Sequence, residues 1–369
     1  MQSTDVCIHG SGAVAHCLAL ALSRQGLAVA LAARPGFELV DRTDVRTYAL
    51  NAASRSLLQQ LKVWEALPPD AVTPVHDMQV SGDDAGARLS FSAWQQGVEA
   101  LAWIVDAAEL DQALHLAASF APHITAVPVP VPASLQVLAE GRDSAARQDL
   151  GVRFERLAYQ HSAVAARLVA DRPHHGVARQ WFRSPDVLAL LPFDKPCAGA
   201  SYGLVWSLPQ ARAHDLMQAS AAEFEAALAQ ATGQACGSLS LQGSRAAWSL
   251  ATAQAVPTCG PGWVLVGDAA HVVHPLSGQG LNLGLGDVAA LASVVAQKEA
   301  WRGLGDVRLL RRYARQRQAP AWLMAQMTDG LQQLFSHPSG IAQAVRRKGM
   351  SLVDHVAPLK RFLANQAMR

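Results

Sequence analysis

The residues from Gly267 to Gly284 have the types and spacing best suited to chemistry in this sequence. An apolar run ends there in Gly267-Asp268, and a carboxylate at a strand end can accept hydrogen bonds from the hydroxyl groups of a polyol. A loop rich in proline and glycine follows and leads into a helix, whose positively polarised start favours negative charge. The stretch therefore suits an extended cofactor with a sugar-alcohol chain and an electron-poor ring that gains negative charge on reduction.

Metal binding is the alternative chemistry for this stretch, because His271 and His274 have the spacing of a metal-binding pair. A metal centre needs further ligands, and no third ligand stands near them in the sequence. A metal would also leave the glycine-rich loop without a purpose. The five cysteines lie far apart and form no CxxC pair, which argues against a zinc ribbon or a disulfide framework. We therefore expect no bound metal.

A second glycine-rich segment lies near the N-terminus, where Gly10, Gly12 and Ala15 follow a short apolar run. A strand, a tight turn and a helix in this order direct backbone N–H groups toward a pyrophosphate. The acidic residue that normally binds a ribose about 20 residues later is absent, because the second strand ends in Ala33-Arg34. Arg34 could instead bind the 2′-phosphate of NADP, so this segment alone leaves a plain NADP dehydrogenase open.

The elements that must position these motifs follow an order typical of two interleaved domains. A strand, a helix and a strand open the chain, short antiparallel strands occupy the middle, and a buried strand and a helix return late. The alternating prolines of residues 127–132 exclude a central strand there. Strands are predicted at Asp5–Ile8, Leu27–Ala32, Met78–Ser81, Ala87–Phe91, Val177–Arg183, Val187–Pro192, Tyr202–Leu208 and Trp263–Gly267, and helices at Ala13–Ser23, Asn51–Trp64, Asp106–Ala118, Ala211–Thr232, Leu281–Gln297 and after Val307.

The predicted fold class is α/β (α+β), with a Rossmann-like dinucleotide-binding domain interleaved with an antiparallel-sheet substrate domain, plus C-terminal helices. A chain of 369 residues, half of them hydrophobic, can bury a core in each domain. The first domain is expected to comprise residues 1–70, 100–155 and 260–300, the second residues 71–99 and 156–259, and the C-terminal helical region residues 301–369.

Composition and charge exclude several other classes of protein. Only 16% of the residues are charged and no long polar tract occurs, which argues against disorder and coiled coil, and the net charge of +2 sets up no strong field for nucleic acid. No signal peptide or membrane-spanning run is found. We expect a cytoplasmic protein whose contact with the inner membrane, if any, is peripheral. Basic clusters at Arg311-Arg312, at residues 346–348 and at Lys360-Arg361 favour such contact, although a solvated helix face explains them equally well.

The stretch from Gly267 to Gly284 strongly resembles the flavin-dependent aromatic hydroxylases with the para-hydroxybenzoate hydroxylase fold, and among them the ubiquinone-biosynthesis hydroxylase branch. The resemblance implies FAD as cofactor, NAD(P)H as electron donor and O2 as second substrate. The implied activity is hydroxylation of an aromatic ring, on a prenylated phenol or quinol of ubiquinone biosynthesis. It covers nearly the whole chain, including Asp5–Leu31, Arg46–Trp64, Ile104–Asp106, Tyr159-Gln160, Ala189–Pro192, Val205–Ser207 and the C-terminal helices.

The same resemblance implies roles for individual residues. Asp268 would bind the ribityl chain, Arg46 would reach the phosphates of FAD, and Pro275 would lie at the reactive edge of the flavin as the one residue assigned to catalysis. Backbone N–H groups of residues 278–282 would bind the pyrimidine side of the ring. The implied cofactor-binding set is Gly10, Gly12, Ala15, Arg46, Asp268, Pro275, Gly278, Gly280, Leu281 and Asn282.

Four positions depart from the family pattern. The ribose-binding acid is replaced by Ala33, a basic or amide residue by Ala107-Ala108, the aspartate of an Asp-Gly motif by Glu140, and the last glycine of the fingerprint by Ala15. Three of these changes affect the ADP half of FAD, so weak FAD binding is expected. They also leave open the alternative that this chain is a non-catalytic relative with the same fold, which acts as a partner within a biosynthetic complex.

The substrate itself leaves less trace in the sequence. Tyr159, Trp181, Leu190 and Trp206 are candidates for lining its cavity, because they stand on strands expected to cover the flavin. Ordinary core packing is the alternative explanation for each of them. No catalytic base is needed, since oxygen activated at the flavin is electrophilic and the substrate phenol supplies electrons. A hydroxylase of a soluble aromatic compound remains the main enzymatic alternative.

Overall fold

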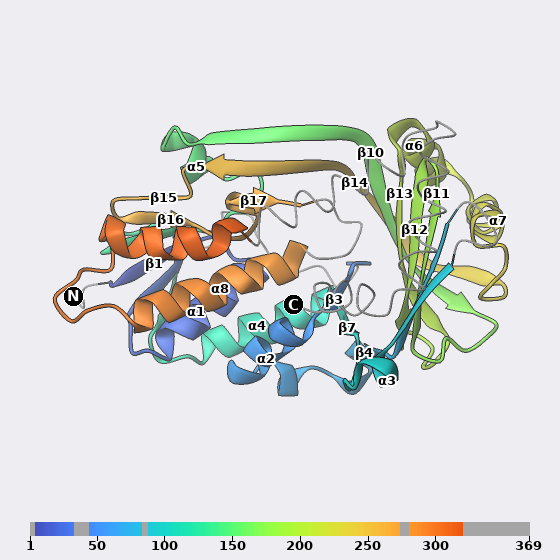
Figure 1. Ribbon diagram of the computed structural model, residues 1–369, viewed down its shortest axis with the longest axis horizontal. Helices are drawn as coiled ribbons and strands as arrows, with labels where there is room; N and C mark the ends of the chain where they lie inside the picture. Colours follow the sequence, from blue (N-terminus) through green and yellow to red (C-terminus); the bar gives the residue numbers. More distant parts are fainter. Residues whose placement is uncertain (1–3, 33–43, 83–87, 274–279, 320–369) are drawn as a thin grey trace.

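The computed structural model describes residues 4–32, 44–82, 88–273 and 280–319, and its elements form two bodies joined by two long strands (Figure 1). One body contains a six-stranded sheet and a three-stranded sheet, and the other is built on an eight-stranded sheet. The predicted α/β (α+β) class, with a Rossmann-like domain interleaved with an antiparallel-sheet domain, is confirmed. The exact domain boundaries stay a prediction.

The six-stranded sheet is mostly parallel. Its strands β16, β9, β1, β2 and β8 run in one direction, and β15 pairs antiparallel with β16 at one edge. Three separate parts of the chain supply these strands. In spatial order they are β15 (Cys259–Gly260), β16 (Trp263–Leu265), β9 (Leu135–Leu138), β1 (Val6–His9), β2 (Val29–Ala32) and β8 (Ile124–Val127).

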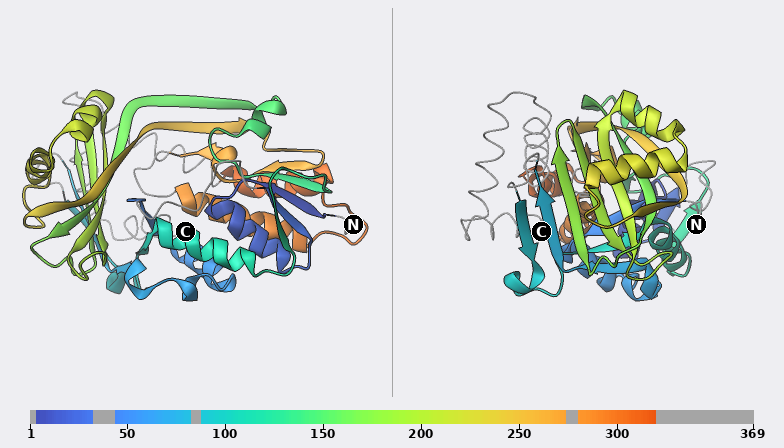
Figure 2. Two further views of the ribbon diagram at one scale, coloured as in Figure 1. Left: turned by 180° about the vertical axis from the view of Figure 1, so that it is seen from behind. Right: turned by 90° about the vertical axis from the view of Figure 1, so that its right-hand side faces the viewer.

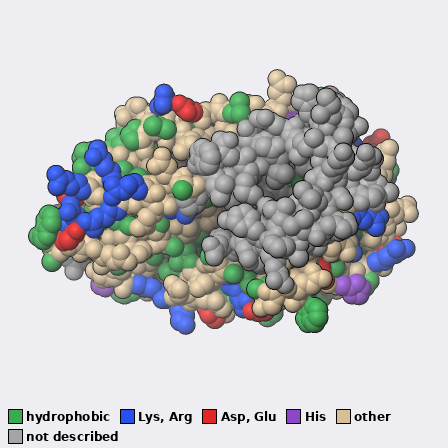
Figure 3. Space-filling model, viewed as in Figure 1, with side chains coloured by type: hydrophobic (Ala, Val, Ile, Leu, Met, Phe, Trp, Pro, Cys, Tyr) green, Lys and Arg blue, Asp and Glu red, His purple; other side chains and the backbone are tan. Residues whose placement is uncertain are grey.

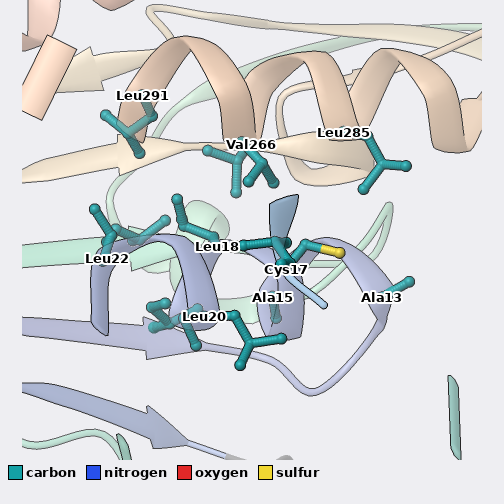
Figure 4. Packing of buried hydrophobic residues seen from close by; sticks show 14 of the residues in the cluster. Ala13, Ala15, Cys17, Leu18, Leu20, Leu22, Val266, Leu285 and Leu291 are labelled. Atoms are coloured by element: carbon teal, nitrogen blue, oxygen red, sulfur yellow. The ribbon is translucent and has the colours of Figure 1, made fainter. Parts of the chain in front are cut away.

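Helices cover one face of this sheet and share a single hydrophobic core with it. They are α1 (Ala13–Ser23), α2 (Ala52–Gln60), α4 (Ala107–Ser119), α8 (Gly280–Ala296) and a helix over residues 307–319. Leu18 and Leu22 of α1 pack in one layer with Leu285 and Leu291 of α8, as Figure 4 shows. On the other face, Cys7 and Ala30 pack against the proline-rich connector around Val131, which explains why that segment is extended.

A small antiparallel sheet links the first body to the second. It consists of β3 (Thr47–Leu50), β7 (Ala102–Asp106) and β4 (Val72–Val75), with β7 in the middle. Two short 3-10 helices, η1 (Trp64–Ala66) and η2 (Pro69–Ala71), connect α2 to β4. Because β3 ends at the start of α2 and β7 at the start of α4, this sheet positions both helices.

The eight-stranded sheet is antiparallel except where β11 pairs parallel with β5. Helices α6 (Gln210–Gln218) and α7 (Ala221–Thr232) pack on its outer face, away from the first body (Figure 2). Three short helices, α3 (Ala93–Gln96), α5 (Ala145–Asp149) and η3 (Gly267–Ala269), lie in the connections. The strand order is β17 (His271–Val272), β14 (Leu239–Val256), β10 (Arg153–Ala170), β13 (Ser201–Pro209), β12 (Asp186–Phe193), β11 (Val177–Arg183), β5 (Asp77–Ser81) and β6 (Arg88–Ser92).

Strands β10 and β14 hold the two bodies together. Each has 18 residues, and their far ends extend over the six-stranded sheet, where β14 pairs with β17 (Figure 1). Phe154 and Ala255 at those ends pack against Leu138 and Leu265 of the parallel sheet. Among the described helices, none is long and apolar enough to cross a membrane.

The predicted single helix over Ala211–Thr232 is wrong, because two helices occupy this range. Ser220 and Glu223 form a capping box, in which each side chain satisfies the backbone N–H of the other residue. This reciprocal cap stops α6 and starts α7 in a new direction.

Candidate cofactor site

Gly10 and Gly12 turn the chain from β1 into α1. The φ of Gly10 is +120°, and a Cβ at this position would lie 2.4 Å from the carbonyl oxygen of Ala139 at the end of β9, so only glycine fits without a backbone shift. Gly12 is the N-cap of α1 and has open space beside it. The first turn of α1 contains no acidic residue, and its N–H groups have no partner within the helix, so an anion can bind there.

The start of α8 lies close to the start of α1. A Cβ on Gly284 would lie 2.7 Å from Cγ2 of Val14, and one on Gly267 would lie 3.3 Å from Cγ1 of the same valine. Two helix N-termini and the end of strand β16 therefore meet on one side of the parallel sheet. Ala15, which replaces the third fingerprint glycine, is fully buried in the core below them.

Asp268 follows β16 at this meeting point. Asp268 keeps a solvent-exposed surface, but many protein atoms surround its carboxyl group. The resulting partial desolvation raises the pKa of this carboxyl, and the nearby His271 and Arg142 oppose the shift. The carboxylate accepts no hydrogen bond from any other described residue. It is thus placed and free to accept hydrogen bonds from a polyol, as the sequence predicts.

Arg46 approaches the same region from the strand β3 side. Its Nη2 lies 2.6 Å from Oδ2 of Asp44, and this hydrogen bond raises the pKa of the guanidinium. Its positive charge also opposes the rise in the pKa of Asp268. Desolvation raises the pKa of the half-buried Tyr48 phenol beside them, with Arg46 opposing this shift and Asp268 adding to it. The two side chains that the resemblance assigns to FAD therefore face a common space.

Asp111 of α4 adds a negative charge to this group. Burial raises the pKa of its carboxyl to about 6, with Arg46 opposing the shift and Asp44 adding to it. Sequence reasoning missed this residue, since the only signal was the helical face that it shares with Ala107 and Ala108. Asp106 caps the same helix by accepting a hydrogen bond from the backbone N–H of Ala108.

A buried ionic network lies directly beneath Asp268. Asp287 is fully buried, and its Oδ2 accepts hydrogen bonds from the N–H of Gly267 at 2.8 Å and from Nε2 of His271 at 2.7 Å. Its Oδ1 accepts one from Nε of Arg317 at 2.6 Å. Burial disfavours the charge of Asp287, but His271 and Arg317 overcome this and hold its pKa below the usual value. His271 thus has a structural partner, and the described residues contain no cluster of acidic, His and Cys side chains able to hold a metal ion.

Asn282 fixes the start of α8 through its side chain. Oδ1 accepts hydrogen bonds from the N–H of Asn51 at 3.1 Å and from Oγ of Ser54 at 2.7 Å, while Nδ2 donates to the carbonyl of Ala49 at 2.8 Å. Leu281 beside it packs against the core, and Gly280 is the first residue of the helix. Pro275 and Gly278 lie outside the described residues, as do His274, Ala33 and Arg34.

Glu140, which stands in place of an aspartate of the family pattern, has a local partner. Its Oε2 accepts hydrogen bonds from Oγ of Ser144 at 2.6 Å and from the N–H of Ala146 at 3.0 Å. The carboxylate therefore stabilises the start of α5. One of its oxygens is already used for that purpose.

Three predicted substrate residues lie in the core on the far side of the eight-stranded sheet. Trp181, Leu190 and Trp206 pack with residues of α6 and α7, and the indole N–H of Trp206 donates to Asp186 at 3.2 Å. The expectation that they face a substrate is therefore corrected. Successive side chains of a strand point to opposite faces of the sheet, and these three point to the face that α6 and α7 cover. Tyr159 is half-buried where β10 leaves this sheet, and its hydroxyl lies 3.2 Å from Oγ1 of Thr252.

The geometry defines a class of protein: a flavoprotein in which a Rossmann-like FAD-binding body faces an antiparallel sheet, the arrangement of FAD-dependent monooxygenases. The chain belongs to the family of proteins with this FAD-binding domain, whose model matches residues 129–328. The predicted FAD cofactor is thereby confirmed, and together with the hydroxylase relatives described next it confirms the monooxygenase class.

Proteins of known sequence and structure agree with this assignment. The chain is 31% identical to ubiquinone hydroxylase UbiL of Rhodospirillum rubrum, over 99% of this chain and 89% of that protein. It is 29% identical to 3-demethoxyubiquinol 3-hydroxylase of Escherichia coli, over 100% of this chain and 99% of that protein. Its fold is similar to that of PqsL, a probable FAD-dependent monooxygenase from Pseudomonas aeruginosa, with a TM-score of 0.76, 19% identity and coverage of 95% and 100% of the two chains.

Proposed function

We propose that this FAD-dependent monooxygenase hydroxylates the aromatic ring of a prenylated phenol or quinol of ubiquinone biosynthesis, with O2 and NAD(P)H as co-substrates. The observation that carries the proposal is the convergence of Asp268, Arg46 and two helix N-termini opposite the antiparallel sheet. The names of the two related ubiquinone hydroxylases support the substrate class.

The residues of this chain fit FAD in an extended form. FAD supplies the chemistry of reducing O2 with electrons from NAD(P)H and of delivering one oxygen atom to an electron-rich ring. The α1 N-terminus and Arg46 would bind the pyrophosphate, Asp268 would accept hydrogen bonds from the ribityl hydroxyls, and the α8 N-terminus would stabilise negative charge on the pyrimidine side. The protein otherwise orients the substrate and excludes water.

The substrate lies, in this proposal, against the inner face of the eight-stranded sheet. Gly203 marks that face, because a Cβ there would lie 2.4 Å from Oγ1 of Thr47 in the FAD-binding body. Val205 and Ser207 follow Gly203 on the same face of β13. Ala163 of β10 pairs with Ser207 on one side and with Trp248 of β14 on the other, so Trp248 lies on this face too. The Ser207 hydroxyl is buried and has no hydrogen-bond partner among the described residues, so it suits an oxygen of the substrate ring.

A hydroxylation assay with two substrate classes tests this function. Purified protein with FAD and NAD(P)H should convert a prenylated phenol into a product 16 mass units heavier, in an amount that depends on O2. A strain lacking the protein should accumulate one under-hydroxylated quinone precursor. Turnover of soluble phenols alone, with an unchanged quinone profile, would replace the proposal by the soluble-aromatic hydroxylase. A protein that binds no FAD would favour the non-catalytic partner.

We further propose that the protein attaches peripherally to an anionic membrane surface through a basic patch at the end far from the substrate-side sheet. Arg308, Arg311 and Arg315 are exposed at helical spacing, and Trp301 beside them is 75% exposed. Figure 3 shows Lys and Arg side chains gathered at this end. Basic side chains and an indole together suit anionic headgroups.

Co-sedimentation with vesicles tests the attachment. Binding to vesicles with phosphatidylglycerol should weaken with salt and fall strongly in a protein with Arg308, Arg311 and Arg315 replaced by Gln, while neutral vesicles should bind little. Replacement of Arg153 and Arg156, exposed on β10, by Gln is the control. Salt-independent binding, or none, contradicts the electrostatic attachment and leaves the hydroxylase proposal intact.

A further inference from the structure

Arg167 of β10 connects the substrate-side sheet to the segment that carries Arg46. Its Nε donates to the carbonyl of Val45 at 2.9 Å, and its Nη2 donates to the carbonyl of Arg46 at 2.9 Å. Nη2 also lies 3.2 Å from Oδ2 of Asp106, and the Arg167 side chain is only 12% exposed. Nη2 also donates to the carbonyl of Asp44 at 3.4 Å, so one guanidinium holds three consecutive carbonyl groups and one carboxylate.

The surroundings of Arg167 leave it a single position. Its guanidinium lies over the ring of Phe193, 4.4 Å from the centroid. The second carboxylate oxygen of Asp106 is occupied by the cap of α4, so that carboxylate cannot turn to follow a moving arginine. The planar Arg167 guanidinium is thus held by hydrogen bonds along its edges and by the Phe193 ring on one face. It therefore fixes the backbone of residues 45–46 relative to β10.

A close contact on the neighbouring strand fixes the same segment. Arg167 pairs in register with Gly203 of β13, where an added Cβ would lie 2.4 Å from Oγ1 of Thr47. The start of β3 therefore rests directly on two adjacent strands of the eight-stranded sheet. Arg46 stands between these anchored residues, and its side chain extends to Asp44 and toward Asp268.

We propose that Arg167 is a positioning residue for FAD: by holding the backbone of residues 45–46, it places the Arg46 guanidinium for the pyrophosphate. The substrate-side sheet thereby sets how tightly the FAD-binding body holds its cofactor. This inference rests on the proposed role of Arg46, since Arg167 has no direct contact with FAD in it. Without Arg167, the Arg46 side chain keeps its ion pair with Asp44 but loses a fixed backbone.

A double-mutant cycle on FAD affinity tests the inference without any turnover. FAD is titrated into apoprotein by fluorescence quenching for the wild type, Arg46→Ala, Arg167→Gln and the double variant. Arg167→Gln should weaken FAD binding about tenfold or more, because it displaces a charge-assisted contact. In the Arg46→Ala background the same change should alter the affinity less than twofold. Arg156→Gln, exposed on the same strand, is the matched control and should bind like wild type.

Each other outcome has a defined meaning. If Arg46→Ala weakens FAD binding and Arg167→Gln does not, or if the two effects multiply, the positioning role is wrong and the proposed site stands. If Arg46→Ala itself has no effect, both the Arg46 assignment and the inference fail. Where Arg167→Gln does not fold, Arg167→Lys keeps the charge for Asp106 but lacks the fork. It should show a weakened affinity that again disappears in the Arg46→Ala background, and full wild-type affinity would overturn the proposal.

Discussion

Asp268 and Arg46 reach one space from segments far apart in the chain, and their charges act on one another across it. Neither side chain is fully buried, so each keeps capacity for a ligand. Their neighbours are different: Asp287 and Asn282 use their polar atoms on the protein itself. At the residue scale the site thus separates ligand-facing groups from the groups that hold them in place.

Asp268→Ala should weaken FAD binding by about ten- to a hundredfold, because one hydrogen bond to a charged group contributes about 1.5–3 kcal/mol. Asp268→Asn keeps one acceptor oxygen, so its affinity for FAD should lie between those of Asp268→Ala and the wild type. Titration of apoprotein with FAD gives the affinities, and circular dichroism checks the fold. Equal affinities for all three proteins would remove Asp268 from the ribityl site.

Asp111→Asn should change stability in a pH-dependent way. Burial raises the carboxyl pKa to about 6 in the folded protein, against about 3.9 when unfolded, so the folded form binds the extra proton between these values. Stability conferred by the wild-type residue therefore falls as the pH rises from 4 to 6. Above pH 7 the variant should be more stable by roughly 1–2 kcal/mol, and near pH 4 it should match the wild type.

The same substitution should tighten FAD binding above pH 7, since it removes a negative charge beside the proposed phosphate site. Asp149→Asn, at an exposed carboxylate, serves as control. Urea unfolding and FAD titration at both pH values provide the measurements. A stability difference that is the same at pH 4 and pH 8 would show that Asp111 does not titrate as described.

The sequence indicated which residue types form the site, but it did not indicate to which side of a sheet each side chain points. Asp268 follows a strand in a glycine-rich context, and that pattern together with the family resemblance predicts its contact with the cofactor. Trp181 and Trp206 stand on strands with apolar residues on both faces, so their alternation gave no sign that α6 and α7 cover them. Arg317 meets Asp287 only after the helix over residues 307–319 folds back, which no motif indicates.

At the element scale, the N-terminus of α8 is held from two sides. Asn282 ties its first turn to the β3–α2 connection, and Asp287 one turn later ties it to η3 and to the helix over residues 307–319. Gly284 between them permits contact with α1. The helix start that is proposed to face the flavin is therefore fixed by hydrogen bonds that its own backbone does not provide.

Asp287→Ala should destabilise the apoprotein by about 3–5 kcal/mol, because it leaves the buried His271 and Arg317 without their shared counter-ion. Glu99→Gln removes the partner of Arg55 in an ion pair whose Glu99 side chain is 69% exposed, and should cost less than about 1 kcal/mol. Urea unfolding of both variants measures the difference. Similar losses in the two variants would mean that the buried network adds nothing specific to the stability of this site.

Helices and strands whose ends and periodicity are visible in the local sequence could be predicted. Strands that are defined only by their pairing with distant strands could not. α1 begins and ends as predicted, since Gly12 and Gly26 frame it, and β11 also matches. The long strand β10 was missed, because its outer half is exposed and mixed while its inner half is apolar, and no single period describes it. Only its pairing with β14 and β13 defines it.

At the scale of the whole molecule, several connections link the two bodies, among them the small sheet, whose Val75 and Ile104 pack with Ala178 and Phe193 of the eight-stranded sheet. The β10 and β14 strands span both, the Arg167 contacts join β10 to residues 45–46, and Phe154 packs against the parallel sheet. The proposed FAD ligands likewise come from three separate segments of the chain. A ligand that bridges these segments should therefore stabilise both bodies, and not only the six-stranded sheet against which it binds.

Hydrogen exchange with and without FAD should report this coupling. Amides that exchange only through global unfolding slow by a factor of one plus the ratio of free FAD to its dissociation constant, about a hundredfold at a hundredfold excess. If the bodies unfold as one unit, amides of β13 in the substrate-side sheet should slow as much as those of β1. Arg167→Gln, compared at the same FAD saturation, should reduce the effect at β13 more than at β1, since it removes one of the connections between the two bodies. Protection confined to the six-stranded sheet in the wild type would show that the two bodies open independently, and that neither the long strands nor the Arg167 contacts couple their stability.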